Sequence, residues 1–380
     1  MNSSLRNRAL ASVAIGGIAL TAAASAFAYQ AGGSSFDNNA FSKWCVAASI
    51  QCSYNSVGST TGIKHQADQL YDWSATDAPL TATQADTLQS KIPGEKPVYI
   101  AALLGGVTFP THVQVSYHGQ QVYKTLNLTA PMLALMFDGQ VKYWNQLNTK
   151  AFAAVNPGVV FPNSQINLCV RDSGSGTSYN ASNYMARSSV VFGQLTGAPS
   201  QNPAWGGNKI LAHGGSGVAA CIASNQNSIG YVDYPDALNA NLQNISKLGH
   251  PIRVSVAKTI HGKRYITNKI KYFFVAPSSA AFTLAGNSSK LDVNVPFKLE
   301  YGLLNSSNPK AYPATITSFV LAYSSYTNPQ LSNGATKLAH IKDFLAYGLG
   351  AGQNTLVADH YAPLPPKLLA KEKALAAHLK

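Results

Sequence analysis

Acidic residues are scarce in this sequence of 380 residues. It has 15 Asp and Glu against 28 Lys and Arg, so the formal net charge is +13. A basic surface attracts anions and raises the rate at which they meet the protein. Because acid neutralises carboxylates, their scarcity leads to the hypothesis that the protein works in acidic surroundings. Apart from a tail at 367–380 the basic residues are scattered, which does not favour a nucleic-acid interface.

Long apolar runs are absent after residue 28. None approaches the ~20 residues that cross a bilayer, so we expect the chain beyond this point to be soluble. Before it, Arg6 and Arg8 precede an apolar run over 9–24 that ends in Ala26-Phe27-Ala28. This pattern predicts a cleaved secretory signal peptide over 1–28 and a location outside the cytoplasm. An uncleaved membrane anchor is the alternative.

Cysteines number only four, a close pair of Cys45 and Cys52 and a distant pair of Cys169 and Cys221. An even number in an oxidising compartment predicts two disulfides, and bonding within each pair is the natural choice among three connectivities. A metal site is the alternative, but the spacings match no Cys-x-x-Cys ligand pair. We predict structural cysteines and no bound metal.

The length and the apolar content, 46% of the residues, are enough for two substantial cores. Short apolar runs alternate with helical patterns, which predicts α/β units with largely parallel sheets. The predicted strands cover 98–104, 166–170, 229–232 and 319–323. The predicted helices cover 131–137, 217–224, 335–347 and, as a basic terminal helix, 367–380.

Three segments place glycines and small hydroxyl residues where a helix should begin. The first N–H groups of a helix lack partners and its dipole favours negative charge, so each segment is a candidate anion site. An ordinary helix cap is the alternative for each. The third segment is more specific, because the guanidinium of Arg171 can hold two oxyanion oxygens at once. The segments are Gly33-Ser34-Ser35-Phe36, Gly58-Ser59-Thr60-Thr61-Gly62 and Arg171-Asp172-Ser173-Gly174-Ser175-Gly176-Thr177.

Asp77 adds a carboxylate to these anion-binding segments. A carboxylate repels a bound anion unless the anion carries a proton that it can donate. An ionised Asp77 would therefore select an oxyanion that keeps a proton. A cap for a helix that begins at Ala78 or Pro79 is the alternative role.

The order and spacing of these segments resemble those of a known family, the phosphate-binding proteins that serve bacterial phosphate ABC transporters. The matching stretches are Val57 to Lys64, Ser74 to Leu80 and Arg171 to Thr177. The resemblance implies an α/β protein with a two-lobed type II periplasmic-binding-protein fold. Each lobe is a mixed sheet flanked by helices, and the ligand lies in the cleft between the lobes. Lobe I would cover 29–106 and 321–380, and lobe II 107–320.

The same resemblance implies a periplasmic receptor that captures inorganic phosphate and delivers it to a membrane permease. Phosphate has a proton to share with Asp77 and sulfate has none. We expect a monomer without metal or organic cofactor. The implied phosphate ligands are Ser35, the Phe36 amide, Ser59, Asp77, Arg171, Ser175, the Gly176 amide and Thr177.

An enzyme is the competing class of function. A phosphatase-like hydrolase could use a histidine as base, but no Gly-x-Ser-x-Gly elbow or metal-ligand cluster accompanies the histidines in the sequence. A Walker A loop for nucleotide hydrolysis is absent as well. A receptor for another oxyanion, such as sulfate or molybdate, is the nearest alternative among binding proteins. We predict a binding protein and not an enzyme.

Overall fold

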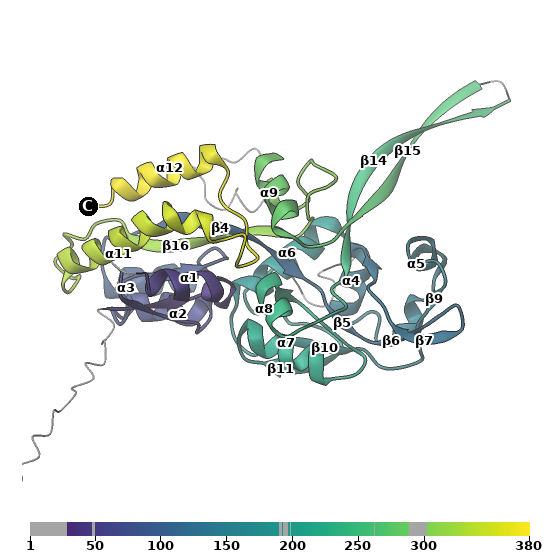
Figure 1. The fold of residues 1–380 in the computed structure, drawn as a ribbon, viewed down its shortest axis with the longest axis horizontal. Helices are drawn as coiled ribbons and strands as arrows, with labels where there is room; N and C mark the ends of the chain where they lie inside the picture. The colour runs from purple at the N-terminus through teal and green to yellow at the C-terminus, as the bar shows by residue number, and fades with distance from the viewer. Residues whose placement is uncertain are drawn as a thin grey trace, which may run out of the picture.

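Two mixed β-sheets with flanking helices form the body of the protein (Figure 1). The computed structural model describes residues 29–380 apart from 48–49, 190–191, 193–196, 198, 262 and 289–301. The predicted signal peptide lies outside the described residues. The alternation of strands and helices confirms the predicted α/β class.

The larger sheet has the strand order β13-β4-β16-β3-β1-β2. Its strand β1 runs parallel to β2 and β3, whereas β16 runs antiparallel to both β3 and β4. All nine residues of β16 and the last nine of β4 are buried, as expected for strands covered on both faces. The strands are β1 (Tyr29–Gly33), β2 (Cys52–Asn55), β3 (Ser74–Thr76), β4 (Pro97–Thr108), β13 (Val232–Asp233) and β16 (Thr315–Tyr323).

The smaller sheet has the order β11-β10-β12-β5, and β10 runs parallel to both of its neighbours. The predicted strand over 229–232 is divided at Tyr231, because the chain passes there from β12 into β13 of the larger sheet. The hydroxyl of Tyr231 accepts from the Arg171 N–H at 3.2 Å and bonds Ser178 Oγ at 2.7 Å. Its strands are β5 (Thr111–His112), β10 (Asn167–Arg171), β11 (Asn208–Ala212) and β12 (Ser228–Gly230).

Several helices begin at the threonine and serine caps that the sequence offers. Thr81, Thr129, Thr149 and Ser175 each accept a hydrogen bond from an amide of the first turn, which satisfies one of its unpaired donors. The four predicted helices are confirmed as α4, α7, α11 and α12. The helices are α1 (Asn38–Cys45), α2 (Ser59–Ala67), α3 (Ala82–Lys91), α4 (Ala130–Phe137), α5 (Lys150–Val155), α6 (Gly176–Ser188), α7 (Gly214–Ser224), α8 (Tyr234–Asn239), α9 (Ser279–Ser288), α11 (Gly334–Gly348) and α12 (Pro366–Ala377). The 3-10 helices are η1 (Ser35–Asp37), η2 (Trp144–Leu147) and η3 (Ala351–Asn354).

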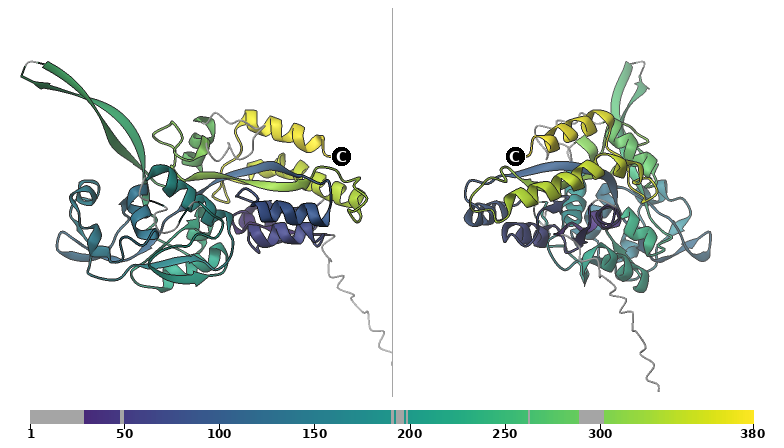
Figure 2. Two further views of the ribbon diagram at one scale, coloured as in Figure 1. Left: turned by 180° about the vertical axis from the view of Figure 1, so that it is seen from behind. Right: turned by 60° about the vertical axis from the view of Figure 1, so that its left-hand side comes forward.

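Two small three-stranded sheets complete the fold, with the orders β15-β14-β8 and β7-β6-β9. In the first of them β14 and β15 form a long hairpin that projects from the body in all three views (Figures 1 and 2). The strands are β6 (Gln114–Tyr117), β7 (Gln120–Tyr123), β8 (Asn127–Leu128), β9 (Val159–Val160), β14 (Lys247–Ile260) and β15 (Lys263–Val275).

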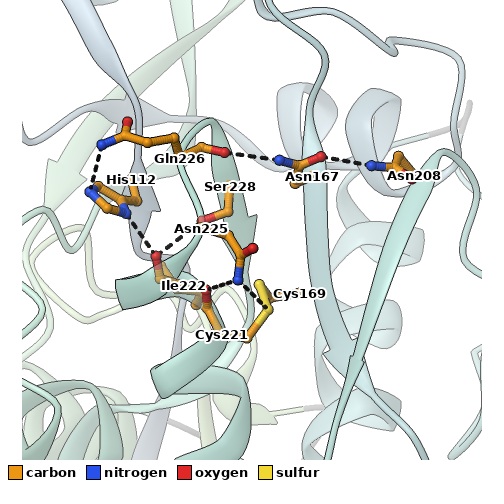
Figure 3. The surroundings of a disulfide bond; sticks show 9 residues. All are labelled: His112, Asn167, Cys169, Asn208, Cys221, Ile222, Asn225, Gln226 and Ser228. Atoms are coloured by element: carbon orange, nitrogen blue, oxygen red, sulfur yellow. Dashed lines mark hydrogen bonds between the residues drawn. A yellow bond between two sulfur atoms is a disulfide. The ribbon is translucent and has the colours of Figure 1, made fainter.

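Two disulfides join Cys45 to Cys52 and Cys169 to Cys221, which is the connectivity favoured from the sequence. The second bond ties β10 to α7 (Figure 3). Beside it the Ile222 carbonyl, near the end of α7, accepts from His112 Nδ1 at 3.0 Å and from Ser228 Oγ at 3.2 Å. The end of α7 is thereby fixed to the smaller sheet.

The terminal helix α12 lies against β4 through a buried carboxyl group. Glu372 Oε2 accepts from the Ala101 N–H at 3.0 Å, and Glu372 is only 3% exposed. Burial raises the pKa of Glu372 to about 7, although the Ala101 bond and the charge of Lys371 lower it. A proton on Glu372 therefore stabilises the folded protein.

Removing the longer disulfide should cost more stability than removing the shorter one. The bonds close loops with sequence separations of 52 and 7 residues, and chain entropy predicts losses of roughly 4 and 2 kcal/mol. The double variant Cys169→Ala/Cys221→Ala should therefore have a lower melting temperature than the matched control Cys45→Ala/Cys52→Ala. Calorimetry under non-reducing conditions measures both. Equal or reversed losses would contradict the expectation.

Glu372 should make the protein less stable as the pH rises. Because its folded pKa is raised above 4.5, its contribution is fully present below this value and is lost as the pH rises through about 7. Glu372→Gln keeps an acceptor for Ala101 without charge. It should exceed the wild type in free energy of unfolding at pH 8 by on the order of 1–3 kcal/mol, with little difference at pH 4.

Urea denaturation across pH measures this difference. Asp86→Asn, which removes an exposed carboxylate from α3, is the control and should follow the wild type. Identical wild-type and Glu372→Gln stabilities at pH 8 would show that Glu372 carries no such cost.

Candidate anion-binding site

Arg171 lies at the carboxyl end of β10 and is buried, with 5% of its surface exposed. Its Nη1 donates to Ser35 Oγ at 3.0 Å and to Ser175 Oγ at 2.9 Å. Its Nε and Nη2 are buried without a hydrogen-bond partner among the described residues. Unpaired N–H groups of a buried cation are costly, so they point to a ligand that supplies acceptors.

Asp77 follows β3 directly and is fully buried. Its Oδ1 accepts from Ser34 Oγ at 2.6 Å and from Ser59 Oγ at 3.1 Å, and its Oδ2 accepts from Thr177 Oγ1 at 3.4 Å. Ser34 and Ser59 follow strands of the larger sheet, whereas Thr177 follows β10 of the smaller one. Asp77 therefore accepts hydrogen bonds from residues that follow strands of both sheets.

The hydroxyl groups around Arg171 and Asp77 sit at the starts of helices. Ser59 is the first residue of α2, and Ser175 caps α6 by accepting from the Ser178 N–H at 3.3 Å. Ser35 opens η1, and its Oγ accepts from the Gly215 N–H at the start of α7 at 3.2 Å. The N-termini of α2, α6 and α7, which are the positive ends of the helix dipoles, thus point toward Arg171 and Asp77.

Glycine is required at two of these helix starts because the backbone approaches carboxyl groups very closely. A Cβ atom at Gly176 would lie 2.0 Å from Asp77 Oδ1. One at Gly215 would lie 2.2 Å from Asp236 Oδ2. A larger residue at either position would force the helix start or the carboxyl group to shift.

Two further carboxyl groups, which the sequence did not single out, lie beside the site. Asp233 Oδ1 lies 3.1 Å from Thr177 Oγ1, so Asp77 and Asp233 share the single proton of this hydroxyl. Asp236, on α8, is 8% exposed and accepts from Asn39 Nδ2 at 3.5 Å. In the sequence, Asp233 precedes the Tyr-Pro start of α8 and looks like an ordinary N-cap. Only its tertiary contacts show that it lies beside the site.

Burial raises the pKa of every one of these carboxyl groups. For Asp77 burial is the largest cause, and the hydroxyls of Ser34 and Ser59 act in the opposite direction. The pKa of Asp233 is raised well above its ordinary value by burial and then by the charges of Asp236 and Asp77. Burial raises the pKa of Asp236 to about 6, against the charge of Arg171.

A fourth carboxyl group beside the site is buried in the same way. Asp37, which ends η1, is also fully buried, and burial and then the charge of Asp77 raise its pKa well above the usual range. Its Oδ2 accepts from Ser318 Oγ at 2.7 Å. Burial therefore favours the neutral form of each of these carboxyl groups relative to an exposed one.

Gln201 connects segments of the larger sheet with a segment of the smaller sheet beside the site. Its side-chain Oε1 accepts from Thr60 Oγ1 at 2.8 Å, and its Nε2 donates to the Pro79 carbonyl at 2.8 Å. Its backbone carbonyl accepts from the Ser175 N–H at 2.8 Å. These contacts bury the site, since Ser35, Ser59, Ser175 and Thr177 are each at most 5% exposed.

All eight predicted ligand residues lie in this region. Seven of them are linked by the contacts above, and Phe36 follows Ser35 in η1. The Phe36 N–H donates to Ser34 Oγ at 3.1 Å, so it already has a partner. Whether each residue contacts a ligand stays a prediction.

No three His, Cys, Asp or Glu side chains in the described part of the chain are arranged to hold a metal ion. Among the helices of the described residues, none has the length and apolar character needed to cross a membrane.

Known proteins resemble the chain over most of its length. A family profile described as "PBP superfamily domain" matches residues 21–349. The phosphate-binding protein PstS of Xylella fastidiosa (strain 9a5c) is 28% identical over 346 residues, which cover 90% of this chain and 83% of that protein. PstS of Pasteurella multocida (strain Pm70) is 26% identical over 356 residues, which cover 90% of this chain and 88% of that protein.

Solved structures share the fold. One is the structure of PfluDING, a high affinity periplasmic phosphate-binding protein, bound with phosphate. It matches with a TM-score of 0.64 at 17% identity, and the match covers 91% of this chain and 93% of that chain. A phosphate-binding protein from Stenotrophomonas maltophilia matches with a TM-score of 0.59 at 17% identity and the same coverage. The predicted two-lobed periplasmic-binding-protein fold is confirmed.

A side chain at Gly176 should disturb the site and the protein. In Gly176→Ala the new Cβ must push α6 away from Asp77, and such overpacking costs roughly 1–3 kcal/mol. Gly217→Ala is the matched control, because its Cβ on α7 would have no neighbour closer than 3.7 Å. The control should be as stable as the wild type or more stable. Chemical denaturation of both variants measures the difference, and equal stabilities would refute the close approach.

Proposed function

Because this chain belongs to the PBP superfamily, we propose that it is a receptor that binds inorganic phosphate between its two lobes. The observation that carries the proposal is the buried guanidinium of Arg171 with two unpartnered nitrogens. A tetrahedral oxyanion would supply the missing acceptors and would lie among helix starts that favour negative charge. Phosphate is the ligand named for the relatives in sequence and for the neighbours in structure.

Neutral dipoles and one cation would hold the anion. We propose that Nε and Nη2 of Arg171 donate to phosphate oxygens while Nη1 keeps its bonds to Ser35 and Ser175. The Phe36 N–H would have to exchange its bond with Ser34 Oγ for a bond with the ligand. The proposed ligands remain Ser35, the Phe36 amide, Ser59, Asp77, Arg171, Ser175, the Gly176 amide and Thr177.

Asp77 would select phosphate from other oxyanions. An ionised carboxylate only accepts hydrogen bonds, so it can take the proton of phosphate but repels sulfate. The hydroxyls of Ser34 and Ser59 favour its ionised form against the effect of burial. A proton retained on Asp233 would leave Arg171 and Asp77 as the main opposed charges around the ligand.

The buried position of the site requires the lobes to separate before phosphate can enter or leave. We propose lobe bounds near residues 106 and 320, where the antiparallel neighbours β4 and β16 would carry the chain between lobes. The bonds of Gln201 to Thr60 and Pro79 would then break and form with each cycle.

Transport is the process that this receptor would serve. We propose that the chain is secreted to the periplasm, binds phosphate without catalysis and delivers it to the permease of an ABC transporter. The relatives support this proposal because they are named as binding proteins and one solved neighbour is periplasmic.

Calorimetric titration with phosphate and sulfate tests the proposal. We expect one phosphate per chain and sulfate binding weaker by about a hundredfold or more, because juxtaposed like charges cost several kcal/mol. Asp77→Asn removes the negative charge and adds a donor, so sulfate should gain affinity relative to phosphate. Asp86→Asn on the exposed side of α3 should leave both affinities unchanged.

The outcomes separate the two parts of the proposal. Absence of heat with phosphate would refute the receptor function. Equal affinity for sulfate and phosphate in the wild type would refute selection by Asp77 while leaving an oxyanion receptor.

A further inference from the structure

The hairpin of β14 and β15, here called the arm (residues 247–275), extends away from both sheets (Figures 1 and 2). The strands pair from Leu248 with Val275 out to Ile260 with Lys263, a ribbon about 40 Å long. Neighbouring strand β8 pairs with β14 only at Lys247 and Leu248. The outer part of the arm is therefore a free-standing two-stranded ribbon.

The arm concentrates positive charge, which corrects the expectation that basic residues are scattered outside the terminal tail. Its sequence contains no Asp or Glu. Seven of the 28 Lys and Arg of the chain fall within it. They are Lys247, Arg253, Lys258, Lys263, Arg264, Lys269 and Lys271.

Large apolar side chains of the arm are exposed as well. Every residue of β15 from Lys263 to Lys271 is exposed. Tyr265, Ile266 and Ile270 are 49%, 67% and 61% exposed, and Phe273 is 44% exposed. Isolated apolar residues are normal on a surface, but four on one strand of an uncovered ribbon indicate a partner.

The strand register mixes charge and apolar surface on both faces of the arm. Residues opposite each other share a face, so Lys269 lies beside Val254 and Lys271 beside Ile252. On the other face Ile270 lies beside Arg253. Neither face is a uniform apolar surface of the kind that packs into a protein core.

We propose that the arm docks on an anionic lipid surface. Lipid headgroups of negative charge pair with lysine and arginine, and the adjoining acyl region accepts tyrosine, phenylalanine and isoleucine. Because each face of the arm has both kinds of side chain, a surface that offers both chemistries satisfies whichever face lies against it. A ribbon free of the body can lie along such a surface without rearrangement of either sheet.

Two other partners fit the arm less well. Nucleic acid would pair with the cations and could stack on Tyr265 and Phe273, but it would leave Ile266 and Ile270 in water. A second copy of the chain would bring two ribbons of like charge together, and lysine-rich edges oppose such strand pairing.

Vesicle co-sedimentation with the whole purified protein tests the proposal. The probes are vesicles of equal parts phosphatidylglycerol and phosphatidylcholine, vesicles of phosphatidylcholine alone, and a DNA duplex as competitor. We expect binding to the anionic vesicles that weakens with salt and little binding to the neutral ones. The variant Lys263→Gln/Arg264→Gln/Lys269→Gln/Lys271→Gln should bind about 600-fold more weakly, since each of the four cations near the surface contributes roughly fivefold.

A matched variant removes four exposed lysines from the body instead, Lys96→Gln/Lys142→Gln/Lys150→Gln/Lys209→Gln. It should bind the anionic vesicles nearly as well as the wild type. Ile266→Ser/Ile270→Ser should also bind more weakly and should retain the salt dependence. Equal losses in the two lysine variants, equal binding to neutral vesicles, or tighter binding of DNA than of anionic vesicles would overturn the proposal. Phosphate titration of each variant reports separately on the proposed receptor function.

Discussion

A single buried guanidinium, that of Arg171, constrains most of the surrounding structure. A cation at 5% exposure is stable only when opposite charge and hydrogen-bond acceptors surround it. The chain meets this requirement only in part, because Ser35 and Ser175 accept from Nη1 while Nε and Nη2 have no partner among the described residues. The disulfide of Cys169, two residues earlier in β10, fixes α7 to the same strand. The position of Arg171 thus depends on contacts with segments that follow strands of both sheets.

The scarcity of acidic residues gains meaning from where the few carboxyl groups lie. Asp37, Asp77, Asp233 and Asp236 are buried in one region, and Glu372 is buried under α12. Burial raises the pKa of all five, so protons stabilise the folded form. This direction agrees with the hypothesis of an acidic environment, because these groups favour the folded protein at lower pH.

Local signals in the sequence predicted four of the strands, four of the helices and the candidate segments around Ser59, Asp77 and Arg171. Caps, apolar runs and glycine-hydroxyl clusters act over a few neighbouring residues, so a single sequence contains them. Asp233 could not be found this way, because its contact with Thr177 joins residues 56 positions apart. The close approach of Gly176 to Asp77 also arises only when the two sheets meet. The division of a predicted strand at Tyr231 has the same cause, since the two pieces belong to different sheets.

Net charge gave the least specific indication of function, and the fold explains why. The candidate anion site uses one cation, Arg171, and surrounds it with carboxyl groups, so it contributes little to the excess of positive charge. The arm holds seven cations and no acid in residues 247–275. Composition alone indicated a surface that attracts anions and a scarcity of acidic residues, without locating the charge. The structure places much of the excess positive charge on a distant ribbon with exposed apolar side chains, whereas the buried candidate site has a single cation among several carboxyl groups.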